Sequence, residues 1–128
     1  MSKFYPPRKD DLLPGEEFRM ILDEEPKIRA GFMVSNMGRV WSLRQGRVLK
    51  QQRCTKGYLR IEVRRGGDRI RKRVHRLVLQ TFVGMPDEYR YITDHINGDK
   101  SDNRLSNLEW VDYYENNRRM VERIRNVA

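Results

Sequence analysis

Three polar side chains in the last third of the sequence are of the types that can activate water at a phosphate. Asp94 and His95 are adjacent, and Asn116 follows further along the chain. Carboxylate and amide oxygens suit Mg²⁺, which keeps several waters and takes one or two protein ligands plus substrate phosphate oxygens. An imidazole with an ordinary pKa near ~6.5 can take a proton from water, and the product would be a hydrolysed phosphodiester. The structural alternatives are a turn-capping carboxylate for Asp94 and a packed, hydrogen-bonded ring for His95.

Short elements have to bring these residues together. The sequence predicts a strand over 89–93 that leads into Asp94, a second strand over 108–111, and a helix after it. Asp112 is typical of a helix N-cap, with Glu115 completing a capping box. A compact hairpin with the helix returning across it would place the strand end near the first helical turn. The loop between the strands carries polar residues that we expect to form turns: Asn97, Asp99, Asp102 and Asn103.

The most regular pattern in the chain predicts a hairpin over 57–75. Apolar and charged residues alternate over 59–63, and the glycines of 65–68 can take the positive φ of a tight turn. Lys72 interrupts the inner face of the return strand, so we expect that strand to lie near a sheet edge. The outward face carries arginines that we expect to bind phosphates: Arg60, Arg64, Arg71 and Arg73.

The remaining segments have simpler patterns. A second hairpin is predicted over 31–43, whereas 18–26 fits a short strand or one helical turn equally well. Residues 74–86 change to helical spacing and end in glycine and proline. His75, near the start of that helix, is interpreted as structural or phosphate-contacting. Residues 1–17 contain three prolines and few apolar side chains, so we expect a mobile arm.

The charge of the chain indicates a polyanionic partner. The net charge is +9 and the pI about 10.0, and residues 44–76 hold 13 lysines and arginines against two acids. Nucleic acid is the first expectation and an anionic membrane surface the second, while RNA or ribosome binding would rest on charge alone. A single cysteine excludes an internal disulfide and a cysteine-rich zinc site. No apolar run approaches the ~20 residues of a membrane span and no secretory signal is visible, so we expect an intracellular protein.

Two stretches resemble known motifs. The segment from "VHRLV" at 74–78 through "DHINGDKSDNRLSNLEWV" to "ENN" at 115–117 resembles the HNH endonuclease family, which is common in phage and intron-encoded nucleases. The stretch "VSNMGRVWSL" at 34–43 resembles the NUMOD-type motif that often precedes this HNH variant. Where that motif usually opens with a tryptophan, the nearest candidate here is Phe18.

The HNH resemblance implies a ββα-metal fold and assigns roles to its motif positions. It implies that His95 is the general base and that Asp94 and Asn116 hold one Mg²⁺ or Mn²⁺ ion. It implies that Asn107 ties the loop to the second strand and helps to orient the histidine. We therefore predict that the catalytic pair is His95 with Asn107 and that the metal ligands are Asp94 and Asn116.

Together these features predict an α+β protein made of three segments. These are a flexible arm (1–17), a NUMOD-like, β-rich and basic DNA-binding segment (18–73), and a C-terminal ββα-metal nuclease unit (74–128). The expected activity is divalent-metal-dependent hydrolysis of DNA, as a nick or a double-strand break, with Arg118 or Arg119 adding a phosphate contact. The alternative is a non-catalytic nucleic-acid-binding protein on the same scaffold. Paired cuts from one active site per chain would favour a homodimer.

Overall fold

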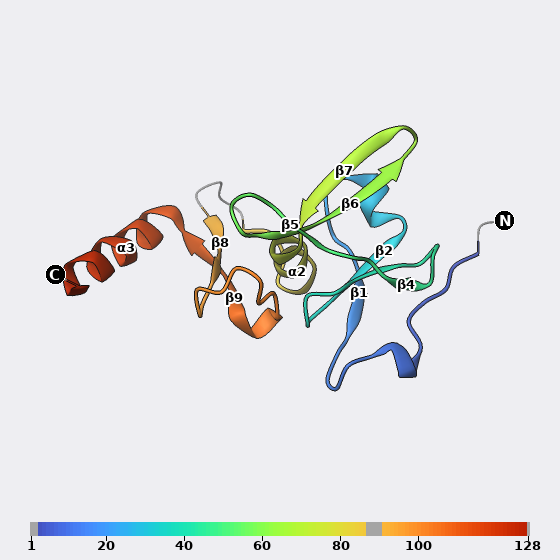
Figure 1. The fold of residues 1–128 in the computed structure, drawn as a ribbon, viewed down its shortest axis with the longest axis horizontal. Coiled ribbons are helices and arrows are strands. Elements are labelled where there is room, and N and C mark those ends of the chain that lie inside the picture. The colour runs from blue at the N-terminus through green and yellow to red at the C-terminus, as the bar shows by residue number, and fades with distance from the viewer. Residues whose placement is uncertain (1–2, 87–90, 128) are drawn as a thin grey trace.

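The computed structural model describes residues 3–86 and 91–127, without the side chains of residues 116, 119 and 127. In this part the chain is an α+β protein, with three antiparallel sheets around a central helix, α2 (Figure 1). The elements, in order, are η1 (Lys9–Asp11), β1 (Phe18–Met20), α1 (Pro26–Arg29), β2 (Phe32–Ser35), β3 (Val40–Ser42), β4 (Arg47–Val48), β5 (Gln52–Arg53), β6 (Leu59–Arg65), β7 (Asp68–Arg73), α2 (Val74–Phe82), β8 (Tyr91–His95), η2 (Leu105–Asn107), β9 (Leu108–Asp112) and α3 (Tyr113–Val127).

The first sheet has the strand order β1-β2-β3-β4. Strands β2 and β3 are the hairpin predicted over 31–43. Its turn contains Gly38 at φ +80°, where a side chain would be strained, and the hydroxyl of Ser35 accepts two backbone N–H groups of the turn at 3.1 Å. The ambiguous segment 18–26 forms β1, which pairs with β2, and α1 begins at its last residue.

Strands β6 and β7 form the hairpin predicted over 57–75, and β5 pairs with the outer side of β6. Gly66 and Gly67 make its two-residue turn at φ +57° and +82°, the combination that matches the twist of the strands. Strand β7 is a sheet edge, as the position of Lys72 predicts. The charge of Lys72 is paired on the inner side, because its Nζ lies 2.9 Å from Oδ1 of the buried Asp23 side chain.

Helix α2 forms the centre of the hydrophobic core. Val74 and Val78 are fully buried, and Gly84 at φ +102° ends the helix, as the sequence predicts. The core crosses the expected boundary at residue 73, since its buried cluster joins the first two sheets, α1, α2 and the start of β9. The members are Ile21, Ile28, Phe32, Val34, Val40, Ile61, Val63, Val74, Leu77, Val78, Leu79 and Leu108.

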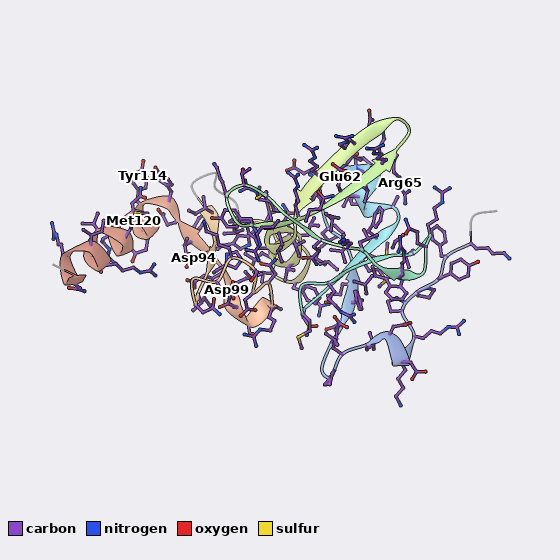
Figure 2. The ribbon with its side chains drawn as sticks, in the orientation of Figure 1. Glu62, Arg65, Asp94, Asp99, Tyr114 and Met120 are labelled. Carbon is purple, nitrogen blue, oxygen red and sulfur yellow. The ribbon has the colours of Figure 1, made fainter. Side chains whose placement is uncertain are left out.

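Strands β8 and β9 pair, and α3 follows directly, which gives the predicted ββα order. The predicted strand residues 89 and 90 lie outside the described residues. Asp112 caps α3 as expected, because its Oδ1 accepts the N–H of Tyr114 at 2.8 Å. The helix extends away from the hairpin instead of returning across it, and Tyr114 and Met120 project from it into solvent (Figures 1 and 2). Its apolar side chains Met120, Val121 and Ile124 remain exposed, so the helix does not pack on the strands through them. No helix in the described part of the chain is both long enough and apolar enough to span a bilayer.

Residues 3–17, for which the sequence predicts a mobile arm, run along the first sheet. The indole N–H of Trp41 donates to the carbonyl oxygen of Tyr5 at 2.7 Å. Arg39 forms a two-pronged ion pair with the fully buried carboxylate of Glu16, with Nε donating at 2.8 Å. Burial acts to raise the pKa of Glu16, but the hydrogen bonds from Arg39 and from a backbone N–H lower it overall. The segment is therefore attached at several points along the sheet.

Candidate active site

His95 is the last residue of β8, at the point where the strand passes into the loop. It is 7% exposed, and its Nε2 lies 2.7 Å from Oδ1 of Asn103. The ring also packs against those of Tyr58 and His75, with centroid distances of 6.0 and 5.0 Å. One hydrogen bond and two ring contacts thus fix the imidazole, an arrangement that suits both a positioned general base and a structural histidine.

Asn107 ties the loop to the second strand, as its predicted role requires. Its Oδ1 accepts the N–H of Asn97 at 3.0 Å, and its Nδ2 donates to the side chain of Asn97 and to the carbonyl oxygen of Asp102. The N–H of the residue after His95 donates to the carbonyl oxygen of Asn107 at 2.8 Å. These bonds hold the backbone beside the histidine, but the amide that touches the ring belongs to Asn103.

Asp94 lies beside His95 on β8, so the two side chains leave opposite faces of the strand. It is half-buried and lies directly opposite Glu109 on β9. The exposed Asp99 lies in the loop that follows β8 (Figure 2). Asn116 is in the first part of α3, but its side chain lies outside the described residues.

A divalent ion fits the chemistry of this pair of strands. Asp94 and Glu109 lie directly opposite each other on the paired strands, so their side chains leave the same face of the hairpin. The described residues contain no group of three or more His, Cys, Asp or Glu side chains suited to a metal. Mg²⁺ requires only one or two protein carboxylates and completes its shell with waters and phosphate oxygens. Asp94 is the described residue that would hold such an ion.

His75, in the first turn of α2, is buried beside His95. Burial lowers the pKa of His75 to about 3, and repulsion from the charges of His95, Arg73 and Arg76 acts in the same direction. Its Nδ1 is buried without a hydrogen-bond partner in the described residues. His75 is therefore a neutral packing partner at neutral pH, in agreement with the structural interpretation and not with a cationic phosphate contact.

Tyr58 connects the basic hairpin with the site. The guanidinium of Arg73 and the ammonium of Lys100 each lie 4.9 Å from the centroid of its ring. Nζ of Lys100 also donates to the carbonyl oxygen of Lys56 at 2.8 Å, which joins the loop after β8 to the loop before β6. Two positive charges are thus held close to His95, where a phosphate would be attracted.

The register of β6 and β7 brings the predicted phosphate-binding arginines onto one face. Arg60 lies opposite Arg73, and Arg64 and Arg71 follow on the same side. Glu62 lies among them and accepts a hydrogen bond from Nε of Arg71 at 2.8 Å, which lowers the pKa of its carboxyl group. The arginine face, defined as the outward side chains of β6 and β7, therefore has an excess of positive charge.

A small pocket of about 150 Å³ opens beside this face, lined by Cys54, Arg60, Arg71, Lys72 and Arg73. Nε of Arg60 is buried without a partner in the described part of the chain. On α3, Arg118 donates to Glu115 at 2.6 Å, and the side chain of Arg119 lies outside the described residues. The four hairpin arginines form one surface, whereas the predicted contacts on α3 belong to a separate element.

Two residues of the site, Asn103 and Tyr58, are not predicted from the sequence. Nothing in the sequence around Asn103 distinguishes it from the turn formers Asn97 and Asp102. Tyr58 lies within the strongly basic residues 44–76, where an aromatic side chain among arginines is a signal for stacking. The contact between Tyr58 and His95 joins residues far apart in sequence, so it follows only from the fold.

Comparison with protein families finds two matches. Residues 72–118 match the model described as HNH endonuclease, and residues 16–64 match the NUMOD4 motif. The HNH range runs from the end of β7 through α2, β8 and β9 into the second turn of α3. The NUMOD4 range ends within β6.

Known proteins give the same result. The chain is 40% identical over 80 residues to the DNA endonuclease I-HmuI of Bacillus phage SP01, covering 62% of this chain and 45% of that protein. It is 41% identical over 93 residues to an uncharacterized HNH endonuclease, L247, of Acanthamoeba polyphaga mimivirus, covering 71% of this chain and 23% of that protein. The chain thus spans less than half the length of these curated relatives.

A solved structure extends the comparison to three dimensions. The structure titled DNA binding and cleavage by the HNH homing endonuclease I-HmuI superposes with a TM-score of 0.71 at 34% identity, covering 84% of this chain and 59% of that one. The superposed share of this chain is larger than the HNH segment, so the likeness in fold extends to elements outside that segment. On its motif, its fold and its relatives, this chain belongs to the HNH endonuclease family, with a preceding NUMOD motif.

Proposed function

We propose that this chain is a divalent-metal-dependent DNA endonuclease that hydrolyses phosphodiester bonds. The observation that carries the proposal is His95, held by a hydrogen bond and ring contacts at the end of β8, next to Asp94 and inside the segment that matches the HNH model. The solved structure of I-HmuI, which concerns DNA binding and cleavage by that enzyme, supports DNA as the substrate.

The residues of this chain would divide the reaction between them. His95 takes the proton from the attacking water, which requires a neutral imidazole with one free nitrogen. Asp94 and Asn116 would hold the ion, which supplies charge stabilisation at the phosphate when it is bound. Asn107 keeps the loop after His95 in place through its bonds to Asn97.

The arginine face would bind the phosphate backbone of DNA. Arg60 and Arg73 lie at the end of the hairpin nearest Tyr58 and His95, and Arg64 and Arg71 continue away from the site. Phosphate contacts give affinity without sequence information, so we propose a loose sequence preference for these residues. The exposed Arg118 would meet a phosphate only where DNA reaches α3.

The decisive experiment is plasmid cleavage. Supercoiled plasmid incubated with the protein and Mg²⁺ or Mn²⁺ should become open-circle or linear, and EDTA should prevent this. His95→Ala should abolish cleavage while retaining DNA binding, and Asp94→Asn should do the same. Asp99→Asn is the matched control. In the described part of the chain this exposed loop carboxylate accepts hydrogen bonds from Ser101, so the variant should cleave as the wild type does.

The alternative, a DNA-binding protein without catalysis, is favoured by the low exposure of His95. Under that alternative, plasmid would stay intact with every metal, and His95→Ala would alter only stability. An open-circle product would indicate nicking. A linear product would indicate paired cuts and thus a homodimer or a second binding event.

A further inference from the structure

Asn103 is the residue that sets which nitrogen of His95 is free. We propose that Asn103 is a positioning residue: its Oδ1 accepts the Nε2–H of His95 and so leaves Nδ1 as the nitrogen that takes the proton. The inference rests on the endonuclease function proposed above, because that function requires a free nitrogen on this ring. Asn103 would then orient the catalytic histidine, although the sequence around it is typical of a turn.

The hydrogen bond with Asn103 determines the tautomer of His95. A neutral imidazole has one N–H and one acceptor nitrogen, and an amide oxygen can only accept. With Oδ1 of Asn103 2.7 Å from Nε2 of His95, the proton has to be on Nε2. In the described contacts Nδ1 of His95 makes no hydrogen bond, and it is not one of the buried atoms left without a partner, so it reaches the surface of the site.

The burial of Asn103 supports a role beyond packing. It is 4% exposed, and its Nδ2 is buried without a partner in the described part of the chain. A buried N–H group without a partner costs about 1–3 kcal/mol, so an apolar or smaller residue would serve a purely structural purpose better. The other half of the same amide makes the contact with His95.

The first hairpin holds Asn103 in place. The loop lies against the turn between β2 and β3, where a Cβ on Gly38 would come within 2.8 Å of Cβ and of the carbonyl oxygen of Asn103. The N–H of Leu105 donates to the carbonyl oxygen of Asn36 in that turn at 2.8 Å. The NUMOD segment thus supports the histidine of the HNH segment through one intermediate side chain.

The ring cannot easily turn away from Asn103. Tyr58 and His75 contact it at centroid distances of 6.0 and 5.0 Å. These contacts restrict the rotamer of His95, while Asn103 selects the tautomer. The two effects are separable, because truncating Asn103 leaves both ring contacts intact.

The tautomer can be measured directly. The chain contains two histidines, so His75→Phe leaves His95 as the single imidazole for long-range ¹H–¹⁵N NMR at neutral pH. In this background we expect a protonated Nε2 and an unprotonated Nδ1. Asn103→Ala should give a mixture of both tautomers, and Asn103→Asp, which keeps an acceptor at the same place, should restore the single one. An Nδ1–H tautomer in the starting protein, or an unchanged tautomer in Asn103→Ala, would overturn the proposal.

Cleavage gives the second readout, in the protein that retains His75. Loss of a group that orients a working side chain typically costs about 10- to 100-fold in activity, so kcat of Asn103→Ala should fall by that factor with DNA affinity unchanged. Asn103→Asp should recover most of the rate, and Ser106→Ala, an exposed neighbour, should have no effect. A full rate for Asn103→Ala would also overturn the proposal.

The two readouts separate this inference from the function on which it rests. A wild-type protein that cleaves no DNA but shows the Asn103-dependent tautomer would overturn the endonuclease function and leave the positioning role intact. Cleavage by the wild type that Asn103→Ala leaves unchanged would overturn the positioning role and leave the endonuclease function intact. If Asn103→Ala does not fold, the tautomer of the starting protein and that of Asn103→Asp decide the matter.

Discussion

Acid should destabilise this fold through His75. Burial, with repulsion from neighbouring charges, lowers the pKa of His75 from 6.5 to about 3, so the ring is neutral in the folded protein while the unfolded chain takes up a proton below pH 6.5. The free energy of unfolding is therefore at its full value above pH 6.5 and falls as the pH drops toward 3. The slope is about 1.4 kcal/mol per pH unit, which amounts to about 2 kcal/mol between pH 7 and pH 5.

Urea unfolding of the wild type and of His75→Phe at pH 7, 6 and 5 measures this effect. The phenylalanine keeps an aromatic ring against Tyr58 and removes the titrating group, so the comparison uses the pH slope and not the absolute stability. Carboxyl groups whose pKa the fold lowers, such as those of Glu16 and Asp102, stay ionised throughout this range and are present in both proteins.

The expected result is a fall of about 2 kcal/mol in the wild type that is missing from the variant. Parallel curves for the two proteins would refute the reasoning, because they would show that His75 accepts a proton in the folded state as readily as in the unfolded one. A steeper fall in the variant would lead to the same conclusion.

Further predictions concern packing and binding. Arg39→Met leaves the buried carboxylate of Glu16 without its partner and should lower the free energy of unfolding by roughly 3 kcal/mol in urea titrations, whereas Arg39→Lys should cost less. Gly38→Ala and Gly67→Ala both place a side chain at φ near +80°, but only the first meets Asn103. Gly38→Ala should therefore lower the free energy of unfolding by about 1–3 kcal/mol more than Gly67→Ala. Equal losses would show that the loop carrying Asn103 moves aside without cost. If about six phosphates are contacted, DNA affinity measured by fluorescence anisotropy should fall roughly 10³-fold between 50 and 200 mM salt, and a nearly flat response would count against the arginine face.

Local patterns were sufficient to predict the elements that carry the site. Period-two alternation located β6, paired glycines located its turn, and helical spacing located α2. The arginine face followed from the same alternation, because a strand that buries one side exposes the other. The order of β8, β9 and α3 followed from two short apolar runs and the capping residue Asp112.

Long-range contacts account for what the sequence did not reveal. Lys72 on the inner face is explained by Asp23, which a different part of the chain supplies. Asn103 differs from the other polar residues of its loop only because the turn at Gly38 packs behind it. The spacing of Met120, Val121 and Ile124 suggested a helix face packed on the strands, but in the structure these side chains are exposed.

The continuous core has a consequence for engineering. Because α2 shares buried residues with the strands before it, the nuclease motif cannot be transplanted alone: a graft that starts at residue 74 would expose the apolar side of α2 to water. The smallest exchangeable cassette reaches back to β1, so a chimera has to inherit the basic hairpin, and with it the affinity for phosphates, whatever targeting module is fused to it.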